Sequence, residues 1–148
     1  MLKETQYQVI NPIPGVVYAP PDELREYMDA GLLTRETMGA AFRSTCEKHA
    51  DRVALASAEH QYTYAELDDL TDRLGAAYLA LGLKPLDRVI FQIANCPELI
   101  ICFYACLKAG LIPICTLAAH REQEIGYLGN HAAARMHFVQ GDDPKFDD

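Results

Sequence analysis

The feature that most constrains the fold is a regular alternation of strand-like and helix-like segments in the second half of the chain. Extended apolar runs at residues 88–94, 112–117 and 136–140 alternate with helical patterns at residues 96–109 and 121–132. Such alternation is typical of parallel strands joined by helical crossovers. The first two runs are apolar without strict alternation, as strands covered on both faces are. The sequence therefore predicts an α/β fold with a partial parallel sheet flanked by helices.

The segments before this alternation predict a short hairpin and an irregular beginning. Extended runs at residues 53–57 and 61–63 indicate the hairpin. Residues 1–34 are rich in proline and glycine and carry one short helical pattern, at residues 22–30. We expect two regions: an N-terminal extension over residues 1–34 that lies against another surface, and an α/β subdomain over residues 35–148.

Three helices of the subdomain have recognisable beginnings. A capping box of Thr63 and Glu66 begins the helix after the hairpin, because each side chain bonds the other residue's backbone N–H. We expect Thr34 to cap the helix at residues 35–49 and Asn95 to cap the one at residues 96–109. The helix after the hairpin carries an apolar stripe that we expect to be buried, made of Leu67, Leu70, Leu74, Ala77 and Leu81.

The composition limits the classes of partner. Thirteen basic and 21 acidic residues give a net charge of −8, which repels phosphate backbones and anionic membrane surfaces. The longest apolar run, residues 99–107, is far shorter than the roughly 20 residues that span a bilayer. We therefore expect no nucleic-acid partner, no membrane contact and a cytoplasmic location. The five cysteines lack CxxC spacing, and we expect reduced thiols in the core.

Catalytic and cofactor motifs are missing from the 148 residues. No glycine-rich loop precedes a helix, as a phosphate site would require, and neither serine lies in a GxSxG turn. The five histidines are scattered and form no HxxxH pair. The acidic run at residues 66–69 begins a helix, where carboxylates complement the helix dipole, so we interpret it as a solvated face. We predict no catalytic, cofactor-binding or metal-binding residue.

Polar residues after two of the strands are the candidates for substrate binding. Asn95 follows the first strand of the alternation, and His120 and Arg121 follow the second. The carboxyl ends of parallel strands are where open α/β sheets bind ligands, so these side chains could face an anionic group. The alternative, which we favour, is structural: Asn95 caps its helix, His120 begins the next one, and Arg121 pairs with Glu124 in solvent.

Several short segments resemble the early motifs of the adenylate-forming ligase superfamily. They are Tyr62-Thr63-Tyr64-Ala65-Glu66-Leu67, Asn95-Cys96-Pro97-Glu98-Leu99 and Leu107-Lys108-Ala109-Gly110-Leu111-Ile112-Pro113-Ile114. Ala119-His120-Arg121, with Glu124-Ile125 and Tyr127, is most similar to the aryl-acid branch, the 2,3-dihydroxybenzoate and salicylate adenylating enzymes of siderophore assembly.

The resemblance implies an acid-activating reaction in two steps. A carboxylate attacks ATP with Mg²⁺ to give an acyl-adenylate and pyrophosphate, and a thiol of coenzyme A or a carrier protein then takes the acyl group. The family's phosphate loop, adenine contacts and mobile lysine follow the matching region. The resemblance therefore places no catalytic residue on this chain: Thr63 and Glu66 correspond to a capping motif, and Lys108 to a helix end.

Three hypotheses follow. The leading one is an N-terminal fragment of an aryl-acid ligase that is inactive alone and pairs with the remainder of the ligase or with itself through exposed sheet surface. The polar residues 141–148, where the alternation stops, favour it. The second is a non-catalytic α/β module that binds another protein. The third, a flavodoxin-like nucleotide binder, requires a phosphate loop after the first strand, where Pro97 removes a donor.

Overall fold

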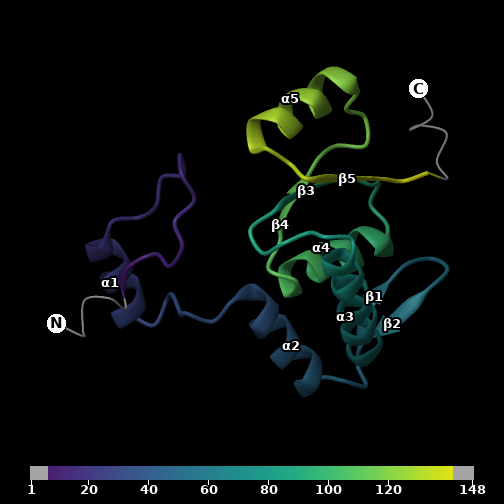
Figure 1. Ribbon diagram of the computed structural model, residues 1–148. Coiled ribbons are helices and arrows are strands. Elements are labelled where there is room, and N and C mark those ends of the chain that lie inside the picture. Colours follow the sequence, from purple (N-terminus) through teal and green to yellow (C-terminus); the bar gives the residue numbers. More distant parts are fainter. Residues whose placement is uncertain (1–6, 142–148) are drawn as a thin grey trace. The chain divides into compact units, whose positions relative to one another are not determined.

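The computed structural model describes residues 7–141. The chain divides into two compact units, Met1–Glu36 and Thr37–Asp148. The residues at 142–148, most of the polar tail noted in the sequence, lie outside the described part. Figure 1 shows the elements of both units along the chain.

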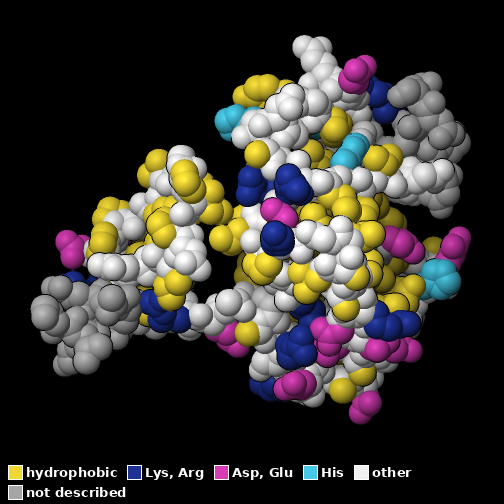
Figure 2. Space-filling view, viewed as in Figure 1, with side chains coloured by type: hydrophobic (Ala, Val, Ile, Leu, Met, Phe, Trp, Pro, Cys, Tyr) yellow, Lys and Arg dark blue, Asp and Glu magenta, His cyan; other side chains and the backbone are white. Residues whose placement is uncertain are grey.

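The described part of the N-terminal unit includes the α-helix α1 (Pro21–Asp29), which begins with a proline at its first position. The hydroxyl of Tyr7 donates to Asp29 at 3.1 Å, and the ring of Tyr7 lies 5.2 Å from the guanidinium of Arg25. None of the described residues of this unit is buried, and its hydrophobic side chains cover much of the face seen in Figure 2.

The second unit is built on a three-stranded parallel sheet. Its strands are β3 (Arg88–Gln92), β4 (Ile112–Cys115) and β5 (Met136–Val139), in the spatial order β4-β3-β5. Both neighbours run parallel to β3. The predicted partial parallel sheet is confirmed.

Helices cover both faces of this sheet (Figure 1). On one face lie α3 (Tyr64–Ala80) and α4 (Pro97–Lys108), and on the other α5 (Glu122–Ala132). The main core lies between the sheet and the first pair of helices, because every second side chain of β3 points there. Its buried residues are Tyr78, Leu83, Val89, Phe91, Ala105, Cys106 and Leu111.

A hairpin and one more helix complete the unit. The hairpin is antiparallel, with β1 (Val53–Ala56) and β2 (Gln61–Thr63), as predicted. Helix α2 (Met38–Lys48) packs on α3 and α4 around a second, smaller core. Aromatic stacking contributes to it, since the rings of Phe42 and Tyr104 lie 3.9 Å apart between centroids. The buried members are Phe42, Cys46 and Leu67.

Of the three predicted helix N-caps, one is confirmed and two are wrong. The capping box is confirmed: Thr63 N–H donates to Glu66 at 2.8 Å, and Glu66 N–H to the Thr63 hydroxyl at 3.2 Å. The predicted cap Thr34 is wrong, because the hydroxyl of Thr37 accepts from the helix at 3.1 Å. Asn95 is also not a cap. Proline at the first helical position makes the residue before it, Cys96, the N-cap in an extended conformation.

The buried stripe of α3 is rotated from the predicted one. Its buried residues are Leu67, Thr71, Gly75 and Tyr78, whereas Leu81 is 65% exposed. The reason is close helix packing: a Cβ on Gly75 would lie 3.1 Å from the carbonyl oxygen of Ala105 in α4. Small residues at this crossing let the two backbones approach.

The cysteines are all free, as expected, but not all lie in the core. Cys46 and Cys106 are buried, whereas Cys115 on the edge strand β4 is exposed, so that part of the prediction is wrong. An edge strand leaves one side of its backbone and part of its side chains open. Among residues 7–141, none of the helices has the length and apolar character required to cross a bilayer.

Candidate functional site

Gln92 lies at the carboxyl end of the central strand β3 and joins the three strands there. It is 7% exposed, and its amide nitrogen donates to the carbonyl oxygens of His120 at 2.7 Å and Ala118 at 3.3 Å. Its amide oxygen lies 3.1 Å from the imidazole nitrogen Nε2 of His137 in β5. Partial burial lowers the pKa of His137, which favours the neutral ring in this contact. The network fixes the loop after β4 against the other strands.

Replacing Gln92 with leucine is expected to lower the free energy of unfolding by about 1–2 kcal/mol, because two partly buried carbonyl oxygens lose their donor. Gln123 in α5 is exposed and provides the matched control. Chemical denaturation of Gln92→Leu and Gln123→Leu measures the difference. Equal stability of the two variants would show that the network contributes nothing.

A hollow of about 700 Å³ lies beside this network, at the carboxyl ends of β3 and β5. Asn95 and Glu98 line it from the start of α4, Glu59 from the hairpin loop, and Phe138 from β5. Cys102 forms part of its apolar wall, and burial raises the pKa of that thiol, so it stays protonated. None of the lining residues that the structure describes is a lysine or arginine, which disfavours phosphate binding by these residues.

The candidate residues His120 and Arg121 lie elsewhere. His120 lines a separate hollow of about 430 Å³ with Tyr127 and Leu128 of α5, and its ring nitrogen Nδ1 is buried without a hydrogen-bond partner among the described residues. Arg121 is the N-cap of α5. The structure thus does not bring Asn95 into one site with these two residues. Their role in substrate binding stays a prediction.

The expected ion pair between Arg121 and Glu124 takes a different form. The carboxylate of Glu124 accepts from the backbone N–H of Arg121 at 3.0 Å, and this bond lowers the pKa of Glu124. An exposed guanidinium gains little from pairing in water, whereas a helix N-terminus has unpaired N–H groups to satisfy.

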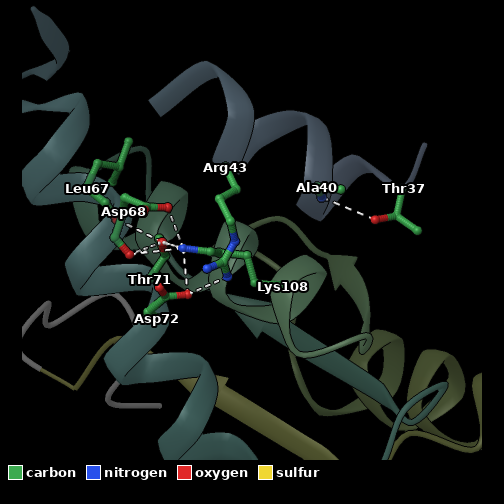
Figure 3. A network of polar contacts seen from close by, with 8 residues as sticks. All are labelled: Thr37, Ala40, Arg43, Leu67, Asp68, Thr71, Asp72 and Lys108. Atoms are coloured by element: carbon green, nitrogen blue, oxygen red, sulfur yellow. Dashed lines mark hydrogen bonds and ion pairs between the residues drawn. The ribbon is translucent and has the colours of Figure 1, made fainter. Parts of the chain in front are cut away.

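The residue that sequence reasoning missed is Lys108, the last residue of α4 (Figure 3). Its side chain is only 3% exposed, and its amino group donates to Asp68 at 2.6 Å and Asp72 at 2.7 Å on α3. The hydroxyl of Thr71 accepts a further hydrogen bond at 3.0 Å. Asp72 also pairs with Arg43 of α2 at 3.0 Å. Asp68 is therefore an ion-pair partner of Lys108, not the solvated side chain that we expected.

The electrostatics of this cluster favour the ionised carboxylates. Partial burial alone would raise the pKa of Asp72, but the hydrogen bond and charge of Lys108, together with Arg43, outweigh it and the pKa is lowered. The same amino group lies 5.7 Å from the centroid of the Phe42 ring. The cluster links three helices and its charges pair with one another, so we interpret it as structural.

Neither ATP nor Mg²⁺ fits the residues described. Among residues 7–141, no three histidine, cysteine or acidic side chains converge as a metal site would require. The described residues that line the hollow at the carboxyl ends of β3 and β5 include the carboxylates of Glu59 and Glu98 and no lysine or arginine, the opposite of what a triphosphate needs. This part of the chain provides a scaffold, and we derive no catalytic step through it.

Comparison with known proteins identifies the scaffold. The sequence profile of the AMP-binding enzyme family matches residues 42–148. The chain belongs to this family. Triostin synthetase I of Streptomyces triostinicus is 39% identical over 128 residues, which cover 86% of this chain and 24% of that protein. The 2,3-dihydroxybenzoate-AMP ligase of Bacillus subtilis is 35% identical, over 80% of this chain and 22% of that protein.

A solved structure gives the same result for the fold. The apo structure of Mycobacterium smegmatis MbtA is 31% identical, with a TM-score of 0.80 over 83% of this chain and 23% of that one. The resemblance to adenylate-forming ligases, closest to the aryl-acid branch, is thereby confirmed. The chain spans about a quarter of the length of the curated relatives that it matches.

Proposed function

We propose that this chain is an N-terminal portion of an ATP-dependent ligase that activates an aryl acid such as 2,3-dihydroxybenzoate or salicylate. The reaction joins the acid to AMP with release of pyrophosphate, and the acyl group then passes to the thiol of coenzyme A or a carrier protein. The observation that carries the proposal is the match of 35% identity to a 2,3-dihydroxybenzoate-AMP ligase over 80% of this chain.

The role of the chain in this reaction is to build part of the scaffold. Gln92 holds the loop after β4 at the carboxyl end of the sheet, and Lys108 joins helix α4 to helix α3. ATP and Mg²⁺ would be held by segments that the relatives have and these residues do not supply. We place the activity in the cytoplasm, where free thiols such as Cys46 and Cys106 stay reduced.

Pyrophosphate exchange tests the proposal. We expect no exchange of pyrophosphate into ATP with this chain alone and any aryl acid. Joined to the downstream three quarters of the Bacillus ligase in place of that protein's own beginning, the chain should restore exchange with 2,3-dihydroxybenzoate. A chimaera that folds, as judged by circular dichroism, but shows no exchange would count against the proposal.

The alternative is a non-catalytic α/β module that binds another protein; it needs no metal, and no three histidine, cysteine or acidic side chains converge within residues 7–141. Both readings predict that the isolated chain does not hydrolyse or exchange ATP. The reading frame after codon 148 separates them. Continuation into a Ser/Thr/Gly-rich loop followed by lysine supports the ligase, and a stop codon supports the module.

A further inference from the structure

A groove lies on the side of the second unit where α2, β1, α3 and α4 meet. Its volume is about 540 Å³, and its lining residues are Met38, Ala41, Phe42, Thr45, Ala54, Leu55, Tyr64, Leu67, Ile100 and Tyr104. None of the lining residues that the structure describes carries a charge. The two hollows described above, in contrast, are bordered by carboxylates, those of Glu59 and Glu98 in one and that of Glu124 in the other. The groove therefore offers an uncharged and largely apolar surface.

The groove is the open side of the smaller core, around Phe42, Cys46 and Leu67. The side chains packed against these buried residues are partly exposed, namely Ala54, Leu55, Tyr64, Ile101 and Tyr104. Met38, which also lines the groove, is 63% exposed. Apolar side chains that stay in contact with water lose part of the hydrophobic stabilisation that complete burial gives. Another apolar surface laid over the groove would complete this core.

The aromatic floor of the groove is held in place by its own contacts. The rings of Phe42 and Tyr104 are stacked with their centroids 3.9 Å apart, and the amino group of Lys108 lies 5.7 Å from the centroid of the Phe42 ring. Lys108 is itself fixed by its ion pairs with Asp68 and Asp72 on α3. Because the floor is already ordered, a surface that docks on it costs little conformational entropy.

We propose that the groove receives an apolar segment from the part of the ligase that follows Asp148. This inference rests on the proposed function, since the relatives have about three quarters of their length outside the region that this chain matches. In a ligase of that length the remainder packs on this quarter. Permanent interfaces are more hydrophobic than transient ones, whose rims are polar. Of the three hollows, the uncharged groove has the character of a permanent interface, so we assign the contact to it.

Thiol labelling at two neighbouring positions of α2 tests the contact. Thr45 and Ser44 are both exposed, but of the two only Thr45 lines the groove. Thr45→Cys or Ser44→Cys is introduced into the whole chain and into the chimaera with the downstream part of the Bacillus ligase, and mass spectrometry of the labelled peptide follows alkylation. Thr45→Cys should react at least about tenfold more slowly in the chimaera, because a covered thiol is inaccessible. Ser44→Cys should react equally fast in both. Equal rates for Thr45→Cys in the chain and in a folded chimaera would overturn the proposal.

A second pair of variants tests the groove in the whole chain by itself. Thr45→Glu puts a carboxylate into the groove, whereas Ser44→Glu puts one next to it on the same helix. The dye ANS, which binds exposed apolar surface, should fluoresce less with Thr45→Glu than with the unchanged chain, and equally with Ser44→Glu. A dye signal insensitive to Thr45→Glu would contradict the proposal, because the groove would then not be open to a docking segment. A dimer of the chain that is lost in Thr45→Glu alone, by sedimentation velocity, would also contradict it, because a second copy would then occupy the groove.

The docking surface and the proposed function can fail separately. Labelling reports on the contact, and pyrophosphate exchange reports on the reaction. Protection of Thr45→Cys in a chimaera that shows no exchange would support the docking surface and count against the proposed function. Exchange without protection would do the reverse.

Discussion

Replacing Lys108 with methionine is expected to lower the free energy of unfolding by about 1–3 kcal/mol, because the partly buried carboxylates of Asp68 and Asp72 lose the buried amino group that bonds them. Methionine retains much of the apolar length of lysine, so the change removes the charge and not the packing. Asp68 and Asp72, four residues apart on α3, then lie beside each other without the amino group that bonds both carboxylates. Urea denaturation, followed by circular dichroism, measures the loss.

Lys48 provides a matched control, since it is also the last residue of a helix, α2, but is exposed. We expect Lys48→Met to change the stability by less than about 0.5 kcal/mol. Adding Asp68→Asn and Asp72→Asn to Lys108→Met should recover part of the loss, because the unpaired charges are gone. If Lys108→Met were as stable as Lys48→Met, the cluster would not hold the helices together.

The arrangement of strands could be predicted because it depends on local patterns. Apolar runs and helix stops near Gly110 are visible within a few residues of sequence, and so is the capping box of Thr63 and Glu66. The N-cap residue of α2 could not be predicted from such local patterns. Thr34 and Thr37 lie three residues apart and are equally suitable caps. The structure separates them by their bonds: the hydroxyl of Thr37 accepts from the backbone N–H of Ala40 in the helix, whereas that of Thr34 accepts from the N–H of Glu36 before it.

The polar contacts were less predictable because their partners are far apart in the chain. Lys108 and Asp68 are separated by 40 residues, and Gln92 and His120 by 28. One signal was present: Asp68 and Asp72 are four apart on one face of α3, and two carboxylates on one face require a cation. The sequence placed Asn95 and His120 after strands correctly, but it could not show that they line two different hollows.

Replacing Gly75 with valine is expected to lower the free energy of unfolding by about 3 kcal/mol, at the upper end of typical overpacking costs. The side chain would begin 3.1 Å from the carbonyl oxygen of Ala105, which is backbone and cannot rotate away. Helices α3 and α4 would have to separate, and the core that they share around Tyr78 would loosen with them. Thermal and urea unfolding both report this change.

The same substitution at Gly126 separates the steric cause from helix propensity. Gly126 lies in α5, where a Cβ would meet nothing within 4 Å. Valine has a slightly higher helix propensity than glycine, so Gly126→Val should be neutral or stabilising by up to about 0.5 kcal/mol. A loss of stability in Gly75→Val, together with no loss in Gly126→Val, would show that the close approach of α3 and α4 requires glycine at position 75. Similar small effects at both would mean that the crossing can widen freely, and the rotated stripe of α3 would then need another explanation.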